Sequence, residues 1–369
     1  MMPVPPRLIA FYLPQFHPIK ENDEWWGKGF TEWTNTAKAT PLFSGHYQPH
    51  VPSDLGFYDL RVPEIRAEQA NLARRYGIEG FCYYHYWFGN GRQLLERPFQ
   101  EVVASGEPDF PFCICWANHS WTGIWSGAGD RMLMKQEYPG PLDDERHFEI
   151  LLPAFRDERY LKVDEKPIFL IYYPFAIPDP RATVQRWRAL AKSAGLPGLH
   201  IVGSYWPNRH ERPEAYGFDA SIHYNNPPLR PWGSWHNPIQ FAYYRWLRAR
   251  GVPTIIDYDA AMKYFLPPEP SLTQYPSVIH AWDNTPRSGV NGIVFRGATP
   301  ERFRVALGRA FNLTRQQKPN HRLIFLKSWN EWAEGNHLEP DLRDGHGFLS
   351  VIAEELHKES AVCEGKAAR

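Results

Sequence analysis

Residues 323–335 read LIFLKSWNEWAEG, a short and mostly apolar run that leads directly into two tryptophans and two glutamates. Short apolar runs without polar alternation are typical of strands buried on both faces, and such strands belong to parallel sheets. Seven similar runs precede this one along the chain. The eight runs are Arg7–Pro14, Ile78–Tyr84, Phe110–Trp116, Pro167–Tyr173, Leu199–Gly203, Ala220–Tyr224, Ser277–Trp282 and Leu323–Ser328. They predict a parallel sheet of eight strands.

Amphipathic stretches alternate with these runs and predict helices between the strands. The predicted helices are Pro63–Tyr76, Arg92–Ser105, Asp143–Phe155, Arg181–Ala194, Pro238–Arg250, Thr299–Gln317 and Gly347–Lys358. The sixth helix has a clear start signal, because Thr299 suits the N-cap and Pro300 suits the first helical position. Only the connector between the fifth and sixth runs is too short for more than a turn or two.

Eight strand–helix units favour a closed barrel over a doubly wound sheet. A doubly wound sheet usually stops at about five or six strands and carries a glycine-rich turn after the first, and no such turn follows Pro14. We therefore predict an α/β fold, a single-domain (β/α)8 TIM barrel with long loops after its strands. The predicted barrel spans residues 1–359, and residues 360–369 are predicted to form a frayed tail.

The composition excludes several classes of protein. Lys+Arg and Asp+Glu are equal at 41 each, so the basic surface that binds nucleic acid is not expected. No apolar run approaches the roughly 18 residues of a membrane helix. The N-terminal residues lack the basic and apolar regions of a secretory signal, which predicts a cytoplasmic protein, although a chain that had lost such a signal would look the same. Nothing in the sequence predicts an oligomeric state.

Aromatic and polar residues gather just after the predicted strands. In a barrel enzyme these positions form the active site, because the loops after the strands share one face. Flat rings can stack on sugar rings, and Asn, Asp and His can bind sugar hydroxyls, so we predict a sugar-binding cleft. The predicted substrate-binding residues are Gln15, His17, His85, Tyr86, Trp87, Trp116, Asn118, His119, Trp121, Asn225, Trp282, Asp283, Asn284, Trp329, Asn330 and Trp332. Any one of them, taken alone, could instead be a packing residue.

Glu331 and Glu334 are the predicted catalytic residues. Glycoside cleavage needs one carboxyl that keeps its proton and one that stays ionised, and a close like-charged neighbour in a partly apolar setting separates the two pKa values. The segment has no Lys or Arg after Lys327, so we expect no salt-bridge partner for the pair. An arginine locked to either carboxyl, or a side chain turned away from the pocket, would rule the reaction out. The structural alternative stays open, because E-x-x-E is a common string.

Other familiar catalytic motifs are absent from the sequence. There is no HExxH string, no acidic cluster and no GxSxG or GKS/T motif. The cysteines Cys82, Cys113, Cys115 and Cys363 lack the pairing of a zinc site, and burial inside strands explains the first three better. We therefore expect neither a metal nor a cofactor.

Several strings resemble known carbohydrate-active proteins. They are LPQFHP at residues 13–18, EWTN at 32–35, GFCYYHYWF at 80–88, CWANHSW at 115–121 and WNEWAEG at 329–335. Together they resemble glycoside hydrolase family 99, the endo-α-1,2-mannosidase family, and more closely the WbsX-like proteins, often described as glycosyltransferases of surface-polysaccharide clusters. The resemblance runs from about Leu8 to Leu349. It implies a (β/α)8 barrel that acts on glycans.

The resemblance also implies roles for the two glutamates. Glu331 would remove the proton of a sugar 2-hydroxyl, whose oxygen attacks the anomeric carbon to give an anhydro-sugar. Glu334 would protonate the leaving group and then activate water. The resemblance thus implies a retaining hydrolase, mannosidase-like and metal-free, acting on an oligosaccharide or polysaccharide. The alternatives are a glycosyltransferase or transglycosylase of O-antigen or capsule biosynthesis, for which no diphosphate site is evident near the strand ends, and a carbohydrate-binding barrel without catalysis.

Overall fold

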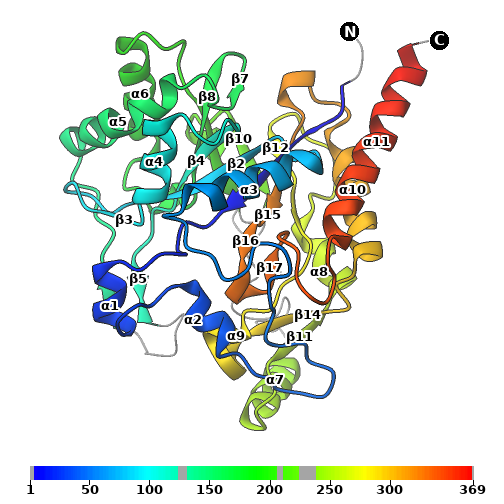
Figure 1. Cartoon of the computed structure of the whole chain (residues 1–369). Helices are drawn as coiled ribbons and strands as arrows, with labels where there is room; N and C mark the ends of the chain where they lie inside the picture. Colours follow the sequence, from blue (N-terminus) through cyan, green and yellow to red (C-terminus); the bar gives the residue numbers. More distant parts are fainter. Residues whose placement is uncertain (1–3, 124–130, 206–210, 224–237, 368–369) are drawn as a thin grey trace.

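The computed structural model describes residues 4–123, 131–205, 211–223 and 238–367. A single parallel sheet forms the centre of the molecule, and its strands lie side by side in a ring (Figure 1). In spatial order the strands of the ring are β12 (Gln274–Tyr275), β10 (Ala220–His223), β9 (His200–Tyr205), β8 (Lys166–Ile171), β4 (Phe112–Trp116), β2 (Gly80–Trp87), β1 (Arg7–Tyr12), β15 (Leu323–Lys327) and β13 (Ser277–Ile279). Every neighbouring pair in this order is parallel.

The ring closes through one segment that is shared between its two ends. β12 pairs with β10, β13 pairs with β15, and only Pro276 separates β12 from β13 in the chain. Proline has no N–H to donate, so it interrupts the ladder, although its carbonyl still accepts a hydrogen bond from the Phe325 N–H at 3.0 Å. The nine strands therefore fill eight positions. All eight predicted runs are confirmed as barrel strands, and the predicted TIM barrel is the observed fold.

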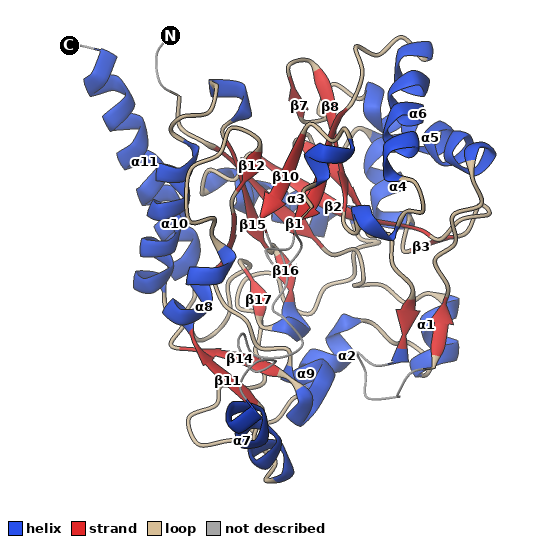
Figure 2. Cartoon of the chain, turned by 180° about the vertical axis from the view of Figure 1, so that it is seen from behind, coloured by secondary structure: helices blue, strands red, loops and turns tan. Residues whose placement is uncertain are grey.

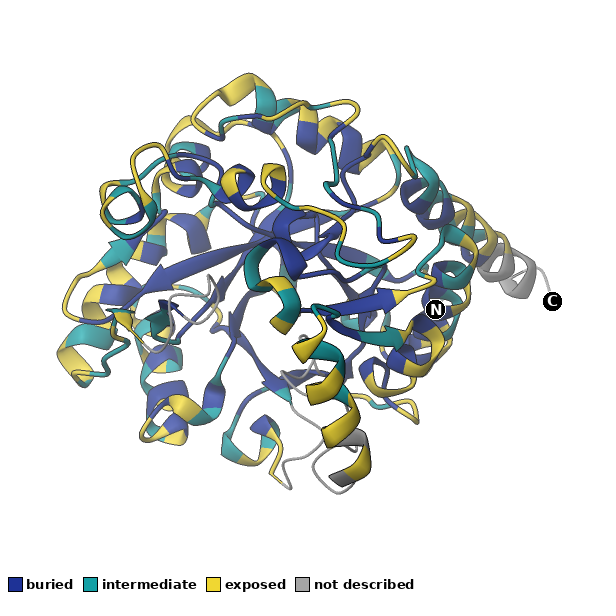
Figure 3. Ribbon diagram, turned by 90° about the horizontal axis from the view of Figure 1, so that it is seen from below, coloured by how far each residue is buried: buried dark blue, intermediate teal, exposed yellow. Residues whose placement is uncertain are grey.

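Burial explains why the strand sequences lack alternation. Every residue of β2, from Gly80 to Trp87, is buried, and so is every residue of β4. Helices cover the outside of the strands, as the view along the barrel in Figure 3 shows, so neither face of the sheet meets water. Aliphatic and aromatic residues therefore occupy successive positions.

The predicted helices all occur, with shifted ends. They are α3 (Pro63–Arg75), α4 (Arg97–Ser105), α5 (Pro141–Arg156), α6 (Pro180–Ser193), α7 (Pro238–Ala249), α10 (Pro300–Thr314) and α11 (Gly347–Ala367). The Thr299 side chain accepts a hydrogen bond from the Arg302 N–H, which confirms the predicted N-cap. α4 begins five residues later than expected, because β3 (Gln93–Leu94) pairs with the end of β2. α11 continues into the segment where a frayed tail was predicted.

Further short elements lie in the segments that connect the barrel strands and the predicted helices, and the sequence did not predict them. The short helices are α1 (Lys20–Trp26), α2 (Glu32–Ala37), α8 (Tyr258–Phe265), α9 (Thr285–Ser288), η2 (Pro174–Ala176), η3 (Pro213–Tyr216), η4 (Gly289–Asn291), η5 (Pro319–His321) and η6 (Trp332–Glu334). The short strands are β5 (Trp121–Thr122), β6 (Met132–Met134), β7 (Lys162–Val163), β11 (Thr254–Asp257), β14 (Ile293–Arg296), β16 (Asn330–Glu331) and β17 (Asn336–His337). β11 and β14 form a separate parallel pair beside α7, away from the barrel ring (Figure 2).

Three cysteines in the barrel strands are free thiols. Cys82, Cys113 and Cys115 are free and buried in β2 and β4, as their apolar surroundings predicted. Across the parts of the chain that the structure describes, no helix combines the length and apolarity that crossing a bilayer requires.

Candidate active site

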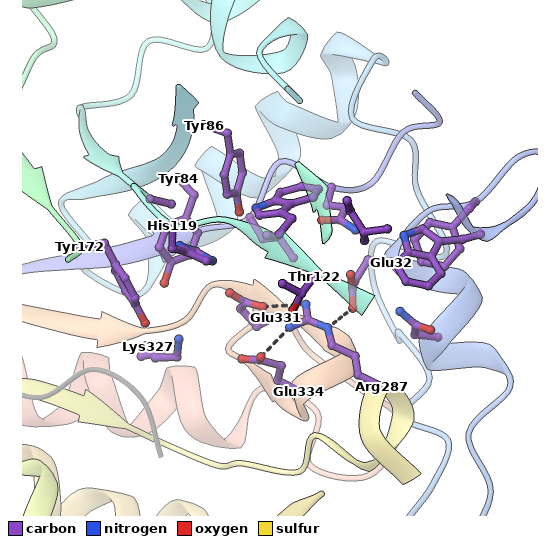
Figure 4. A pocket seen from close by; sticks show the side chains of 18 of the residues that line it. Glu32, Tyr84, Tyr86, His119, Thr122, Tyr172, Arg287, Lys327, Glu331 and Glu334 are labelled. Atoms are coloured by element: carbon purple, nitrogen blue, oxygen red, sulfur yellow. Dashed lines mark hydrogen bonds and ion pairs between the residues drawn. The ribbon is translucent and has the colours of Figure 1, made fainter. Parts of the chain in front are cut away.

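A cavity open to solvent lies at the carboxyl ends of the barrel strands. Aromatic rings and charged groups share its wall, as Figure 4 shows. The lining residues are Leu13, Gln15, Trp26, Phe30, Glu32, Asn35, Tyr84, Tyr86, Ala117, His119, Trp121, Thr122, Leu133, Tyr172, Tyr173, Arg287, Lys327, Glu331 and Glu334.

Both predicted catalytic glutamates line this cavity. Glu331 ends the short strand β16 and Glu334 ends the single turn η6, and the two side chains are 6% and 9% exposed. The next residue, Gly335, has φ +53°, and a Cβ there would lie 2.9 Å from the Cβ of Asp283. Only glycine permits this close approach. It lets the Asp283 N–H donate to the Glu334 carbonyl oxygen at 2.6 Å, which fixes the segment against the end of the seventh strand.

One arginine contacts both glutamates. The Arg287 guanidinium donates to Glu334 at 2.5 Å and to Glu331 at 3.1 Å, and its Nε donates to Glu32 at 2.7 Å (Figure 4). The expectation that the pair has no salt-bridge partner is therefore wrong. The expectation rested on the neighbouring sequence, whereas Arg287 comes from α9, more than 40 residues before the glutamates. Glu32 comes from α2, at the other end of the chain.

The electrostatics of this cluster favour a proton on Glu334 near neutral pH. The pKa of Glu334 is raised to about 7, because burial and the negative charge of Glu331 raise it by more than Arg287 and Lys327 lower it. Burial lowers the pKa of Arg287, but the charges of Glu32, Glu334 and Glu331 outweigh burial and raise that pKa. Arg287 therefore stays positively charged. One guanidinium faces three carboxyl groups, so a proton on one of them reduces the excess of negative charge.

Six predicted residues face the cavity: the two glutamates together with Gln15, Tyr86, His119 and Trp121. Tyr86 and Trp121 meet edge to face, with ring centroids 5.0 Å apart. Burial lowers the pKa of His119 to about 4, so this histidine is neutral at physiological pH. The four side chains offer a ring surface and neutral hydrogen-bonding groups beside the acids.

Eleven predicted residues do not line the cavity and are buried behind it. They are His17, His85, Trp87, Trp116, Asn118, Trp282, Asp283, Asn284, Trp329, Asn330 and Trp332. The two asparagines hold the backbone of lining residues: Asn118 bonds both the N–H and the carbonyl of Tyr173, and Asn330 does the same for Leu13. The remaining predicted residue, Asn225, lies outside the described residues.

The histidines and tryptophans of this set have specific packing partners. His85 lies 2.9 Å from His147 of α5, between their Nε2 atoms, and Trp87 stacks on His147 at 4.7 Å. The Nδ1 of His17 donates to the Pro14 carbonyl at 3.0 Å. Trp332 donates to Glu339 at 2.6 Å, a bond made behind the cavity.

The sequence did not single out several residues of the cavity wall. Tyr84 and Tyr172 sit near the ends of predicted runs, where a closer reading of strand ends could have included them. Glu32 stands in the EWTN string at residues 32–35, which was noted only as part of the resemblance. Arg287 has no local signal, because it occupies a helix of four residues.

The model of the family described as Glycosyltransferase WbsX matches residues 8–352. The chain belongs to the WbsX family. This WbsX-family chain is 39% identical over 358 residues to "Uncharacterized protein WxcX" of Xanthomonas campestris pv. campestris, in each of two strains. The match covers 96% of the chain and 50% of WxcX, so the chain spans about half the length of the curated relatives it matches.

Solved structures share the fold of this WbsX-family chain. A glycoside hydrolase-like protein aligns with a TM-score of 0.61 at 15% identity, covering 96% of this chain and 95% of the other. The family 99 endo-alpha-mannosidase of Bacteroides thetaiotaomicron aligns with a TM-score of 0.54 at 16% identity, covering 96% and 98%. The predicted resemblance to the WbsX-like and family 99 proteins is therefore confirmed. The chain belongs to the WbsX family and has the TIM-barrel fold of these structures.

Proposed function

We propose that this chain is a retaining glycoside hydrolase, mannosidase-like, in which Glu334 is the acid/base and Glu331 is the base. The observation that carries the proposal is the raised pKa of Glu334, about 7, on a carboxyl that faces a cavity beside a second carboxyl. A general acid works best when its pKa lies near the working pH. Aromatic rings around the pair supply the flat surfaces that sugar rings pack against.

In the proposed reaction the glycan provides its own nucleophile. Glu331 takes the proton of the 2-hydroxyl, and that oxygen attacks the anomeric carbon while Glu334 gives its proton to the departing glycosidic oxygen. The product of this step is an anhydro-sugar and a shortened glycan. Glu334 then takes a proton from water, the water oxygen opens the strained ring, and Glu331 returns a proton to the 2-hydroxyl. Two inversions at one carbon give net retention.

Arg287 is compatible with these roles, although an arginine locked to either carboxyl was expected to rule them out. Each glutamate gives it one oxygen, Glu331 Oε2 and Glu334 Oε1. The second oxygen of Glu334 accepts no hydrogen bond from the described residues, so it remains available to a substrate. The pKa of Glu334 is raised even with Arg287 in contact. Arg287 therefore orients the pair without removing the proton that the reaction needs.

The second candidate is a glycosyltransferase or transglycosylase, which the description of the family favours. A sugar hydroxyl could take the place of water in the second step, with the same two glutamates. Arg287 and Lys327 both line the cavity and could face a phosphate of an activated or lipid-linked sugar. A barrel that only binds glycans is the third candidate.

A panel of defined oligosaccharides tests these alternatives together. The wild-type chain and an E331Q/E334Q variant are incubated with each glycan, and the release of reducing ends is followed while NMR reports the anomer formed first. A hydrolase gives new reducing ends of retained configuration with the wild type only. Release of the inverted anomer would refute the proposed mechanism. Binding of nucleotide sugars or glycan elongation, without hydrolysis, would select the transferase, and glycan binding without any turnover would select the third candidate.

A further inference from the structure

We propose that His50, His337 and Asp341 bind one divalent transition-metal ion, with Zn²⁺ the best match. The three side chains converge behind the segment that bears the glutamates. Nδ1 of His50 lies 2.8 Å from Nε2 of His337, and Oδ2 of Asp341 lies 3.5 Å and 4.0 Å from these two nitrogens. Three ligands of one zinc ion, each at about 2.0–2.2 Å in tetrahedral geometry, lie about 3.2–3.6 Å apart. The observed separations of 2.8, 3.5 and 4.0 Å need only small side-chain movements to reach that geometry.

The remaining polar atoms of His337 and Asp341 are held in the way that metal ligands are held. Nδ1 of His337 lies 2.9 Å from the Glu339 carbonyl oxygen, which can only accept, so Nδ1 carries the proton and Nε2 keeps its lone pair. Oδ1 of Asp341 accepts from the N–H groups of Arg343 and Asp344 at 3.0 and 2.7 Å, which directs Oδ2 toward the histidines. Such outer hydrogen bonds orient ligands and set the histidine tautomer.

A simple pair of hydrogen-bonded histidines explains the cluster less completely. His50 could donate from Nδ1 to His337, which accounts for the 2.8 Å contact. Oδ2 of Asp341 would then accept no hydrogen bond from the described residues, although the side chain is only 3% exposed. A carboxylate so little exposed to water gains from a partner on its second oxygen. A cation between the three atoms supplies one.

The donor set indicates the class of metal. Two imidazole nitrogens and one carboxylate oxygen suit zinc and its first-row neighbours, whereas Ca²⁺ and Mg²⁺ prefer oxygen alone. His50 is the most exposed of the three ligands, with 12% of its side chain exposed, and it offers a route for the ion and a place for a water as the fourth ligand. No local motif marks the site, because its members come from the loop before α3 and from the last hairpin. That is why the sequence predicted no metal.

The ion would fasten the catalytic segment from behind. His337 lies on β17, which pairs with β16, so it sits opposite Asn330 and next to the partner of Glu331. The loop that carries His50 also carries His46 and Gln48, which contact Oδ2 of Asp283 at 2.6 and 2.7 Å. Asp283 in turn bonds the backbone of Glu334. These ligands are positioning residues, and the site does not depend on the proposed reaction.

Metal binding by the whole chain tests the proposal directly. The purified chain is stripped with a chelator, mixed with ZnCl2, separated from free ions and analysed for bound zinc. We expect one zinc ion per chain, and visible absorption of tetrahedral or five-coordinate Co²⁺ when cobalt replaces zinc. H50Q and D341N should each weaken zinc binding by at least about 10-fold. The control is H357Q, which changes an exposed histidine of α11 and should bind zinc as the wild type does.

Two further measurements separate loss of a ligand from loss of the fold. Zinc should raise the melting temperature of the wild type and of H357Q, but not that of D341N. X-ray absorption of the zinc-loaded wild type should show nitrogen and oxygen ligands with two imidazoles, a readout that needs no variant. No retained zinc in the wild type, equal zinc in all variants, or a zinc ion without imidazole ligands would each overturn the proposal.

Discussion

Two glutamates five residues apart, Glu334 and Glu339, have similar acidity and different surroundings. Burial raises the pKa of each to about 7. Glu334 faces the cavity and contacts Arg287 through one oxygen, leaving the other without a protein donor among the described residues. Glu339 lies behind the cavity, and both of its oxygens accept hydrogen bonds, from Tyr58, Gln69 and Trp332. One carboxyl is open to a substrate and the other is enclosed.

This contrast shows that a raised pKa does not by itself identify a catalytic acid. Desolvation is the largest cause for both residues, so the two pKa values carry the same information about burial. The charge of Glu331 raises the pKa of Glu334, whereas hydrogen-bond donors lower that of Glu339. Access to the cavity and a like-charged neighbour, together with the shift, distinguish the candidate acid. Structural networks perturb acidity as strongly as active sites do.

The largest expected effect is a loss of turnover when glutamine replaces Glu334 and no acidic proton is available. E334Q should reduce turnover on unactivated glycans by about 10²–10⁴-fold, because general acid catalysis contributes that much, while glycan binding stays close to wild type. Initial rates and a binding titration measure the two quantities. E339Q is the matched control, since it changes a carboxyl of similar pKa outside the cavity. Equal losses in both variants would erase the distinction between the two glutamates.

The second-largest expected effect is a change in the pH profile when Arg287, which contacts both glutamates, is replaced. Arg287 lowers the pKa of Glu334, so R287Q should raise it and move the alkaline limb of the kcat/KM profile to higher pH, by at least about one unit. The sign follows because a general acid loses activity as pH rises through its pKa. The control is R302Q, an arginine that pairs with Asp257 and Asp259 at the surface. An alkaline limb that stays in place in R287Q would contradict the assignment.

A smaller shift of opposite sign is expected at the third carboxyl. The charge of Glu32 raises the pKa of Glu334, and E32Q removes that charge while leaving Arg287 to the other two glutamates. The pKa of Glu334 should fall, and the alkaline limb of the kcat/KM profile should move to lower pH by a fraction of a unit. The same pH titration measures it. A shift to higher pH would mean that Glu32 acts mainly by holding Arg287 in place.

The smallest expected effect on turnover belongs to Glu339, whose role is stability. E339Q should keep the wild-type turnover of the folded fraction but lower the free energy of unfolding by about 1–3 kcal/mol, because one amide oxygen cannot serve three donors. A raised folded-state pKa means that wild-type stability falls as pH rises from about 4.5 to about 7. E339Q should reduce that slope. The free energy of unfolding is measured with urea at several pH values. If its slope against pH is the same in E339Q as in the wild type, Glu339 is not the cause of the pH dependence.

The parts of the fold carried by contiguous residues were predictable from the sequence. The eight strands and the Glu331–Glu334 pair are continuous strings, so pattern and spacing were enough. Strand seven shows the limit: the run Ser277–Trp282 was found, but the two residues before Pro276 that complete the ring are too few to give a pattern. β11 and β14 were missed for the same reason, since each strand has four residues and pairs across the chain.

Of the candidate site, the sequence predicted the two acids together with Gln15, Tyr86, His119 and Trp121. Glu331 and Glu334 share one segment, whereas Arg287 contacts them only in the folded chain. Because Arg287 precedes Glu331 by 44 residues in the sequence, no pattern beside the glutamates indicates it. The tryptophans were the least informative class: Trp329 and Trp332 flank the acids in sequence and are fully buried. An aromatic residue that follows a strand therefore lies at the carboxyl end of the barrel. The sequence does not say whether its ring faces inward, outward or toward a ligand.

We expect the barrel to open locally at the segment around Pro276 more easily than elsewhere. Among the described residues, β10 and β12 share two register pairs, whereas β2 and β4 share five. Backbone amides near residues 221–222 and 274–275 should therefore exchange with deuterated solvent before those of β2 and β4, because local opening begins where cross-strand bonds are fewest. β15, which leads into the glutamates, pairs with the other half of this segment, so this weakly paired place lies one strand from the hairpin that bears Glu331.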